Sequence, residues 1–250
     1  DSKRLVTGGS DGTAKVWEIG PQFQEQWSLS AQETSSGLVG VAFSPDGTRV
    51  MAGDAGITAV KVWDLGPTGN AEWANLPAAG RPAAEFMPDG RGVVTTSSQG
   101  ADFETGRALT IWDLQTGRDL RTIGPATDFL RFLAFDVSPD GESIALGGKS
   151  VKDFGGASAV RAWDASTGEE IYRIGHRLDV NEVAYSPDGE YLATASYDGT
   201  AKIVDRSGRL IQVLGETSGP SFGEFNFSDV AFSFDGRRVA TAQELYGQRF

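Results

Sequence analysis

The sequence predicts an all-β fold built from repeated four-stranded antiparallel units, and two observations carry this prediction. The first is a Pro-Asp-Gly turn that recurs along the chain, as in VAFSPDGTRV from Val41 and VAYSPDGEYL from Val183. The second is a short motif ending in Trp-Asp, such as KVWD from Lys61, which alternates with the turn in fixed order. Self-similarity with a period of roughly 20–50 residues indicates an architecture of stacked repeats.

Five copies of each mark divide the chain. The turn aspartates recur every 43 to 51 residues, at Asp46, Asp89, Asp140, Asp188 and Asp235. The second mark occurs as KVWE from Lys15, KVWD from Lys61, TIWD from Thr110, RAWD from Arg161 and KIVD from Lys202. Each unit therefore carries two marks at corresponding places, and each is expected to fold in the same way.

Each unit is interpreted as four short strands, a to d. In strand a, Val183 and Tyr185 alternate with small residues, and the Pro-Asp-Gly turn then ends the strand because proline presets φ and glycine permits positive φ. Strand b follows, as in YLATAS from Tyr191, and strand c contains the Trp-Asp mark. Strand d comes after a further turn, as in EIYRIG from Glu170. One such sheet cannot bury both of its faces, so successive units are expected to stack face to face around an axis as a β-propeller.

One stretch carries a family resemblance. The segment GHRLDVNEVAYSPDGEYLATASYDGTAKIVD, from Gly175 to Asp205, resembles the repeat of WD-repeat β-propellers, and its style is similar to that of bacterial WD-repeat domains. The resemblance covers essentially the whole chain. It implies a buried hydrogen-bonded chain through His176, Ser196 and Asp198, with Val204 where the family has tryptophan. The other units keep that tryptophan, at Trp17, Trp63, Trp112 and Trp163.

The order of the strands predicts four complete units with partial units at both ends. The expected boundaries within a single domain are a partial blade at 1–36, blades at about 37–79, 80–126, 127–176 and 177–217, and a partial blade at 218–250. Closure with five blades leaves one strand over, whereas closure with seven blades, which are common in the resembling family, leaves strands missing. We expect part of a seven-bladed ring in a longer protein that carries or acts with an effector domain.

Composition excludes several classes of function. The 250 residues carry a formal net charge of −12, which opposes binding to a phosphate backbone, so nucleic acid is not an expected partner. With no cysteine and a single histidine, neither a metal site nor a cofactor is expected. No apolar run approaches the roughly 20 residues of a membrane span, and no signal peptide is apparent. We therefore expect a cytoplasmic protein with no membrane contact.

The function is predicted to lie in the long connections between strands b and c and between strands d and a. Aromatic residues occur there among glycine, serine and charged residues, a composition typical of binding patches. The alternative for each phenylalanine is that it folds back to pin its own loop. The sequence thus predicts a non-catalytic signalling scaffold or sensor that binds a protein or peptide. The predicted contact residues are Phe103, Glu104, Arg107, Asp128, Phe129, Lys152, Asp153, Phe154 and Phe222.

Two carboxylates keep open the alternative of a propeller enzyme. Glu85 and Asp136 stand in strand a where the other units have alanine. Paired carboxylates near a central channel can act as general acid and base in a hydrolase or lyase. The structural interpretation is that each pairs with an arginine, for which Arg81 and Arg131 are close in sequence, because an unpaired carboxylate in a packed strand costs several kcal/mol.

Overall fold

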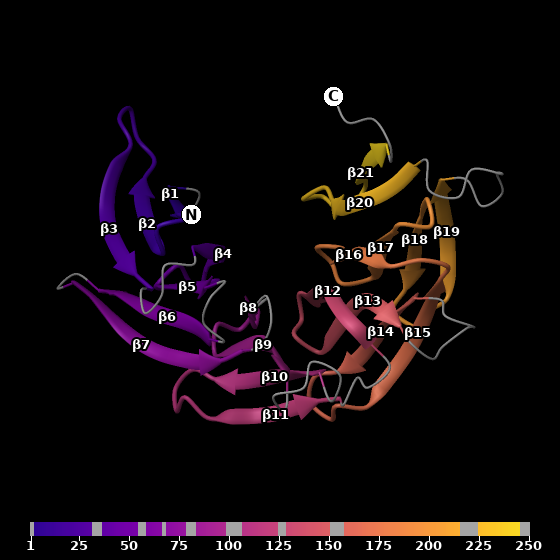
Figure 1. Cartoon of the computed structure of the whole chain (residues 1–250), viewed down its shortest axis with the longest axis horizontal. Coiled ribbons are helices and arrows are strands. Elements are labelled where there is room, and N and C mark those ends of the chain that lie inside the picture. Colours follow the sequence, from indigo (N-terminus) through magenta and orange to yellow (C-terminus); the bar gives the residue numbers. More distant parts are fainter. Residues whose placement is uncertain are drawn as a thin grey trace. The chain divides into compact units, whose positions relative to one another are not determined.

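The structure is a computed structural model, and it describes residues 3–31, 37–54, 59–66, 69–78, 84–98, 107–124, 129–150, 158–215 and 225–245. All regular elements in these ranges are β-strands (Figure 1). The strands form antiparallel sheets in two compact units, Asp1–Pro125 and Ala126–Phe250. No helix in the described ranges is long and apolar enough to cross a membrane.

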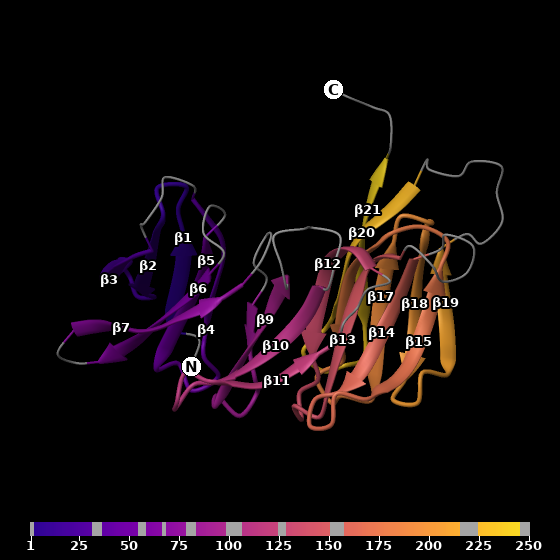
Figure 2. The same cartoon turned by 60° about the horizontal axis from the view of Figure 1, so that its bottom comes forward.

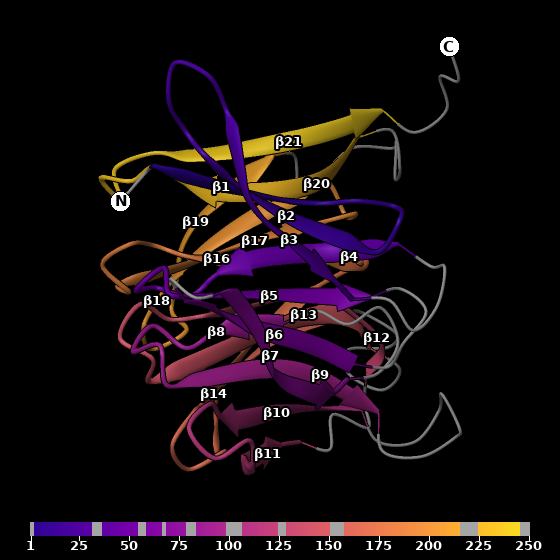
Figure 3. The ribbon, with the colours of Figure 1, turned by 90° about the vertical axis from the view of Figure 1, so that its left-hand side faces the viewer.

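The first unit contains sheets of three, four and four strands. The first sheet consists of β1 (Arg4–Gly8), β2 (Thr13–Glu18) and β3 (Gln24–Ser30). The second consists of β4 (Leu38–Phe43), β5 (Arg49–Asp54), β6 (Ala59–Gly66) and β7 (Gly69–Pro77). The third consists of β8 (Ala84–Phe86), β9 (Gly92–Ser98), β10 (Arg107–Asp113) and β11 (Asp119–Ile123). In Figure 3, strands β4, β5 and β6 run side by side within their sheet.

The second unit contains sheets of four, four and two strands. Its first sheet consists of β12 (Phe129–Val137), β13 (Ser143–Ser150), β14 (Ser158–Asp164) and β15 (Glu170–His176). The next consists of β16 (Val180–Tyr185), β17 (Tyr191–Ser196), β18 (Thr200–Asp205) and β19 (Leu210–Gly215). The last consists of β20 (Phe225–Phe232) and β21 (Val239–Leu245). Figure 2 shows the two four-stranded sheets of this unit lying alongside each other.

In the part of the chain that the structure describes, the predicted order of strands is confirmed. A three-stranded sheet, four four-stranded sheets and a two-stranded sheet follow one another, and strands adjacent in sequence are adjacent in each sheet. Each four-stranded sheet is therefore an antiparallel meander. Its a-to-b and c-to-d turns lie at one end, and its b-to-c and d-to-a connections leave from the other.

The Pro-Asp-Gly turns are held by their own side chains. In the turn of the second sheet, Ser44 Oγ donates a 2.6 Å hydrogen bond to Asp46 Oδ1, which also accepts the Thr48 amide at 2.9 Å. The Arg49 amide donates to Ser44 Oγ at 2.9 Å, and Gly47 takes a φ of 68°. The same serine-to-aspartate bond of 2.6 Å recurs at Asp140, Asp188 and Asp235. These carboxylates therefore close their turns, which makes the turn a local property of the sequence.

Each hydrophobic core lies between two successive sheets. In the first unit, Val16 of β2 and Trp63 of β6 share one core, and in the second, Val160 of β14 and Leu192 of β17 share another. The central strands of the middle sheet in each unit are covered on both faces as a result, and β17 is buried at every position from Leu192 to Ser196. Because burial of apolar surface stabilises by about 25 cal/mol per Å², each sheet depends on its neighbours for stability.

A β-bulge recurs at one place in five sheets. The pairing between the third and fourth strands of the repeat shifts register at Trp17, Trp63, Trp112, Trp163 and Val204. A bulge bends its strand and re-aims the side chains around it. The residue after the bulge then caps the following turn: Asp164 Oδ1, for example, accepts the amides of Ser166 at 2.9 Å and Thr167 at 2.7 Å.

Candidate functional site

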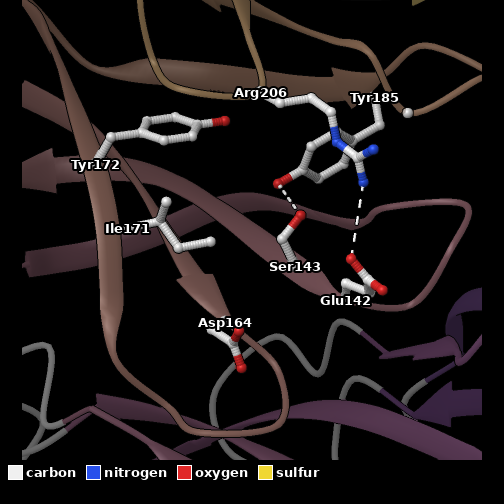
Figure 4. Close-up of a pocket in the computed structure, with 8 residues that line it drawn as sticks. Glu142, Ser143, Asp164, Ile171, Tyr172, Tyr185 and Arg206 are labelled. Atoms are coloured by element: carbon white, nitrogen blue, oxygen red, sulfur yellow. Dashed lines mark hydrogen bonds and ion pairs between the residues drawn. The ribbon is translucent and has the colours of Figure 1, made fainter.

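A cleft lies in the second unit where two successive sheets meet at their turns (Figure 4). Its volume is about 220 Å³. The β12–β15 sheet contributes Glu142, Ser143, Asp164, Ile171 and Tyr172. The β16–β19 sheet contributes Tyr185, Gly189 and Arg206. The cleft is thus built from the turns and strand ends of two repeats and belongs to neither sheet alone.

Hydroxyl groups line the inner part of the cleft. Ser143 Oγ donates to Tyr185 Oη across the two sheets at 3.0 Å. Burial raises the pKa of Tyr185 and of Tyr172, whose side chains are also hydrogen-bonded to each other. Both phenols are therefore neutral at physiological pH. The Tyr172 ring also packs closely on Gly208, where a Cβ would lie 2.5 Å from Tyr172 Cγ.

Carboxylates surround the one guanidinium at the rim. Arg206 forms an ion pair with Asp140 and lies 3.5 Å from Glu190 and 3.9 Å from Glu142. Burial alone would raise the pKa of Asp140, but hydrogen bonds from Ser138 and the Glu142 amide, with the charge of Arg206, hold it below its usual value. Asp164 also lines the cleft, so the described residues of this rim include four carboxylates and one arginine. The rim is therefore acidic.

The predicted inner-strand carboxylates take part in structural contacts. Asp136 Oδ2 accepts the Tyr185 amide of the next sheet at 2.6 Å. Glu85 is half-buried on β8 and is also engaged by protein groups. A backbone amide is thus one partner of Asp136, and the expected pairing with an arginine stays a prediction. Arg81 and the side chain of Arg131 lie outside the described part of the chain.

A third carboxylate of the inner strands is Glu182 of β16. Burial raises its pKa to about 7, and the charges of Asp229 and Asp136 add to the effect. The strand that carries it is tied to the following sheet as well, because Asn181 Nδ2 donates to the Phe227 carbonyl at 2.9 Å. Nothing in the repeat pattern marked Glu182, whose pKa depends on packing between sheets.

The single histidine, the last residue of β15, lies in a buried polar cluster with residues of the β16–β19 sheet. His176 is 3% exposed, with Nδ1 at 3.1 Å from Asp198 Oδ2 and Nε2 at 2.8 Å from Thr194 Oγ1. Burial lowers its pKa, so a neutral ring donates to the carboxylate and accepts from the threonine hydroxyl. Burial by itself raises the pKa of Asp198, but hydrogen bonds from His176, Thr200 and the Arg177 amide hold it well below its usual value.

Most of the predicted contact residues lie outside the described part of the chain. Arg107 and Phe129 begin strands β10 and β12, at the sheet ends opposite the Pro-Asp-Gly turns, where their backbones pair with Ser98 and Ser150. Their side chains are not described. The residues outside the described ranges are Phe103, Glu104, Asp128, Lys152, Asp153, Phe154 and Phe222. In the described ranges, no group of three or more His, Asp or Glu side chains is placed to hold a metal ion.

Comparison with known families finds a match in two stretches of the chain. The family model described as "WD domain, G-beta repeat" matches residues 1–18 and 168–205, and the second match spans the Asp198 turn and strands β16 to β18. These two stretches are similar to WD repeats. The four-stranded antiparallel sheets in series are consistent with the blades of a WD-repeat propeller.

Similar proteins in other organisms are longer than this chain. The guanine nucleotide-binding protein subunit beta of Oryza sativa subsp. japonica is 24% identical over 254 residues, covering 93% of this chain and 61% of that protein. The corresponding subunit of Zea mays is 26% identical with the same coverage. The serine-threonine kinase receptor-associated protein of Gallus gallus is 26% identical over 204 residues, covering 81% of this chain and 52% of that protein. The chain thus spans between half and two thirds of the length of these relatives.

The polar cluster around His176 includes a threonine that sequence analysis did not name. Thr194, two residues before Ser196, supplies the hydroxyl next to His176. Ser196 Oγ instead donates to the Leu178 carbonyl at 3.1 Å and accepts the Asp198 amide at 3.1 Å. Thr194 and Ser196 lie on the same face of β17, so sequence alone does not separate them. The tertiary position of the imidazole ring decides between them.

Two other repeats of this chain show what the threonine does when tryptophan is present. Trp17 Nε1 donates to Thr7 Oγ1 at 2.9 Å, and Trp112 Nε1 donates to Thr95 Oγ1 at 2.8 Å. Both threonines hold the place that Thr194 has in its own repeat. Because Val204 has no donor, the hydroxyl of Thr194 faces only the histidine and the Lys202 carbonyl, 3.4 Å away.

Sequence analysis did not single out the cleft residues. Tyr172 and Tyr185 stand at strand positions where hydrophobic residues are expected, and Arg206 occupies a turn where any polar residue is compatible. One feature of the sequence could have indicated the cleft. Tyr185 stands at a position where the repeats containing VAFSPDG and AFSFDG have phenylalanine. A hydroxyl added to a packed aromatic residue requires a partner, and here that partner is Ser143.

Proposed function

We propose that this chain is a non-catalytic protein-binding module whose partner is a protein or peptide. The relatives support this proposal because their names describe proteins that assemble with others, a "subunit" and a "receptor-associated" protein. The observation that carries it is the sharing of cores between successive sheets. Within each unit, such packing holds neighbouring sheets together and makes a rigid support, on which connecting segments can present side chains to a partner.

The binding surface is proposed to be the ends of the sheets opposite the Pro-Asp-Gly turns. The turns at the near end satisfy their polar groups internally, as in the bonds of Asp46 and Asp188. The long connections that leave from the far end are the part of the repeat that varies most in sequence. The contact residues are proposed to be those predicted from the sequence, with Phe103, Phe129 and Phe154 at their centre.

The experiment is affinity capture with alanine variants of these three phenylalanines, followed by identification of the partner and measurement of its Kd with purified components. We expect loss of the partner with no change in melting temperature. Phe23→Ala is the matched control, because Phe23 is 61% exposed in the connection between β2 and β3 and lies at the turn end of its sheet. Equal loss of the partner in the Phe23→Ala control, or lower melting temperatures in the three variants, would contradict the proposal.

The enzyme alternative receives less support. Asp136 accepts a backbone amide of the next sheet, which gives it a structural function. Glu182 has a pKa suited to proton transfer at neutral pH, but such values also arise in structural clusters. The bacterial origin, the cytoplasmic location, the effector domain and the seven-bladed ring stay predictions from the sequence.

A further inference from the structure

We propose that the cleft lined by Tyr172 and Tyr185 binds the cationic side chain of a lysine or arginine from a partner protein. This site is separate from the surface described under the proposed function. The cleft lies at the end of its sheets that carries the a-to-b and c-to-d turns, whereas the proposed contact loops leave from the other end. The two proposals can therefore fail independently.

The charge of the rim selects a cation. Asp140, Glu142 and Glu190 form ion pairs with Arg206, and Asp164 also lines the cleft, so four carboxylates accompany one cation among the described residues of the rim. Hydrogen bonds from Ser166 and Thr167 lower the pKa of Asp164, so it is ionised at neutral pH. An arriving guanidinium or ammonium group meets a net attraction, whereas phosphate or a carboxylate meets a net repulsion.

The size and wall of the cleft select a side chain. A volume of about 220 Å³ is below the roughly 300–1,000 Å³ of pockets for whole small molecules, so the cleft suits one extended side chain. Ile171 is 48% exposed in its wall and lies between the Tyr172 ring and Ser143 in Figure 4. The aliphatic stem of lysine or arginine covers such a surface while its charged head stays in a polar environment.

The hydroxyl groups and rim carboxylates supply acceptors for the charged head. Tyr185 and Ser143 bring hydroxyl oxygens from two different sheets to one place, 3.0 Å apart. Lysine has three donors and arginine five, and neither has an acceptor, so a wall of acceptors matches both. Arg206 competes with the incoming cation for these carboxylates. Its side chain is 48% exposed, and its positive charge already neutralises part of the negative charge of the rim.

The primary test is a nuclear magnetic resonance titration of the ¹⁵N-labelled chain of 250 residues. The probes are acetyl-Gly-Gly-X-Gly-Gly-amide peptides in which X is arginine, lysine or glutamine, together with inorganic phosphate. We expect the arginine and lysine peptides to shift the amide signals of Ser143, Tyr172 and Gly189, and the shifts to shrink as salt is raised because exposed charges are screened. We expect no such shifts with the glutamine peptide or phosphate.

Two charge variants sharpen the test. Glu142→Gln removes one exposed rim carboxylate and is expected to weaken the arginine peptide about twofold to fivefold. Arg206→Gln removes the internal competitor and is expected to strengthen binding by a similar factor. Asp119→Asn is the control, because it makes the same charge change as Glu142→Gln on β11 in the first unit, and it is expected to leave the Kd unchanged. Circular dichroism melts show that each variant is folded.

Three results would overturn the proposal, and the first two need only the unaltered chain. One is the absence of shifts at the cleft with 10 mM arginine and lysine peptides. Another is an equal response to the glutamine peptide, which would assign binding to the peptide backbone. The third is phosphate binding at the cleft that is lost in Arg206→Gln, which would make the site an anion site centred on the guanidinium.

Discussion

The amide of Tyr185 donates a 2.6 Å hydrogen bond to the Asp136 carboxylate, and this bond joins two successive sheets. Asp136 lies on β12 and Tyr185 at the end of β16, 49 residues further along the chain. A charged acceptor makes such a bond stronger than one between neutral groups. The carboxylate that replaces alanine in this repeat therefore connects two neighbouring sheets through a hydrogen bond.

Replacing Asp136 tests how much this hydrogen bond contributes to stability. Asp136→Ala is expected to lower the free energy of unfolding by about 1.5–3 kcal/mol, because the Tyr185 amide loses a charged acceptor. Asp136→Asn keeps an acceptor oxygen and should cost less. Urea denaturation measures both, with Glu169→Ala on an exposed turn as control. A cost no larger than that of the control would show that the bond contributes nothing to stability.

Thr194 is expected to be needed for the buried histidine. Thr194→Val keeps the shape of the side chain but removes the hydroxyl from Nε2 of His176, leaving a buried acceptor without its partner. The expected cost is about 1–3 kcal/mol in free energy of unfolding. Thr241→Val is the matched control, since Thr241 holds the equivalent position on β21 and is partly exposed. The assignment of Thr194 would be wrong if the two variants lost equal stability.

Acid is expected to destabilise the sheet that holds His176. Burial lowers the pKa of this histidine below 6.5, so the unfolded chain binds a proton more readily than the folded one. The free energy of unfolding then falls as the pH drops below about 6.5. His176→Gln removes this contribution, so its unfolding free energy should change less between pH 7 and pH 5 than that of the unaltered chain. An unchanged slope in chemical denaturation across this range would contradict the pKa shift.

Glu182 is expected to give the free energy of unfolding a pH dependence opposite to that of His176. Its pKa rises from 4.5 to about 7 on folding, so the folded protein holds this proton more tightly than the unfolded chain does. The free energy of unfolding should therefore decrease as the pH rises from 4.5 through 7, by about 1–3 kcal/mol, with the lower end favoured because the carboxyl is partly exposed.

Glu182→Gln removes this titration. The variant should exceed the unaltered chain in stability at pH 8 by more than it does at pH 5, as measured by denaturant midpoints at both values. Glu169→Gln, which removes an exposed carboxylate, serves as control and should shift neither midpoint. A difference between Glu182→Gln and the unaltered chain that does not change with pH would show that Glu182 has an ordinary pKa in the folded protein.

The repeat and its turns could be predicted because their causes are local. The bonds that close the turn at Asp46 join only residues between Ser44 and Arg49, a segment of six residues. The strand order followed from the same marks, since each turn and each Trp-Asp pair locates two strands. The structure adds the bulge at Trp63 and its counterparts, which strand periodicity alone does not reveal.

The cleft and the hydrogen bonds between successive sheets could not be predicted in the same way. In the sequence, Tyr185 is one more aromatic residue of strand a. Its neighbours in sequence do not predict its contacts with Ser143 and Asp136. The contact of Thr194 with the histidine could not be predicted for a related reason. Thr194 and Ser196 share one face of β17, and only the position of the His176 ring, at the end of β15, separates them.

The amino-acid sequence by itself determined the unit of this protein: where its strands begin and end, how its turns close, and that each sheet needs a neighbour on its faces. Those properties depend on residues a few positions apart, whose preferences act before any long-range contact forms. Tertiary structure decided which polar groups meet across successive sheets, as Asp136 meets the Tyr185 amide and Ser143 meets the Tyr185 hydroxyl. These hydrogen bonds join residues more than forty positions apart, and they form only when the shared cores have set the distance between the sheets.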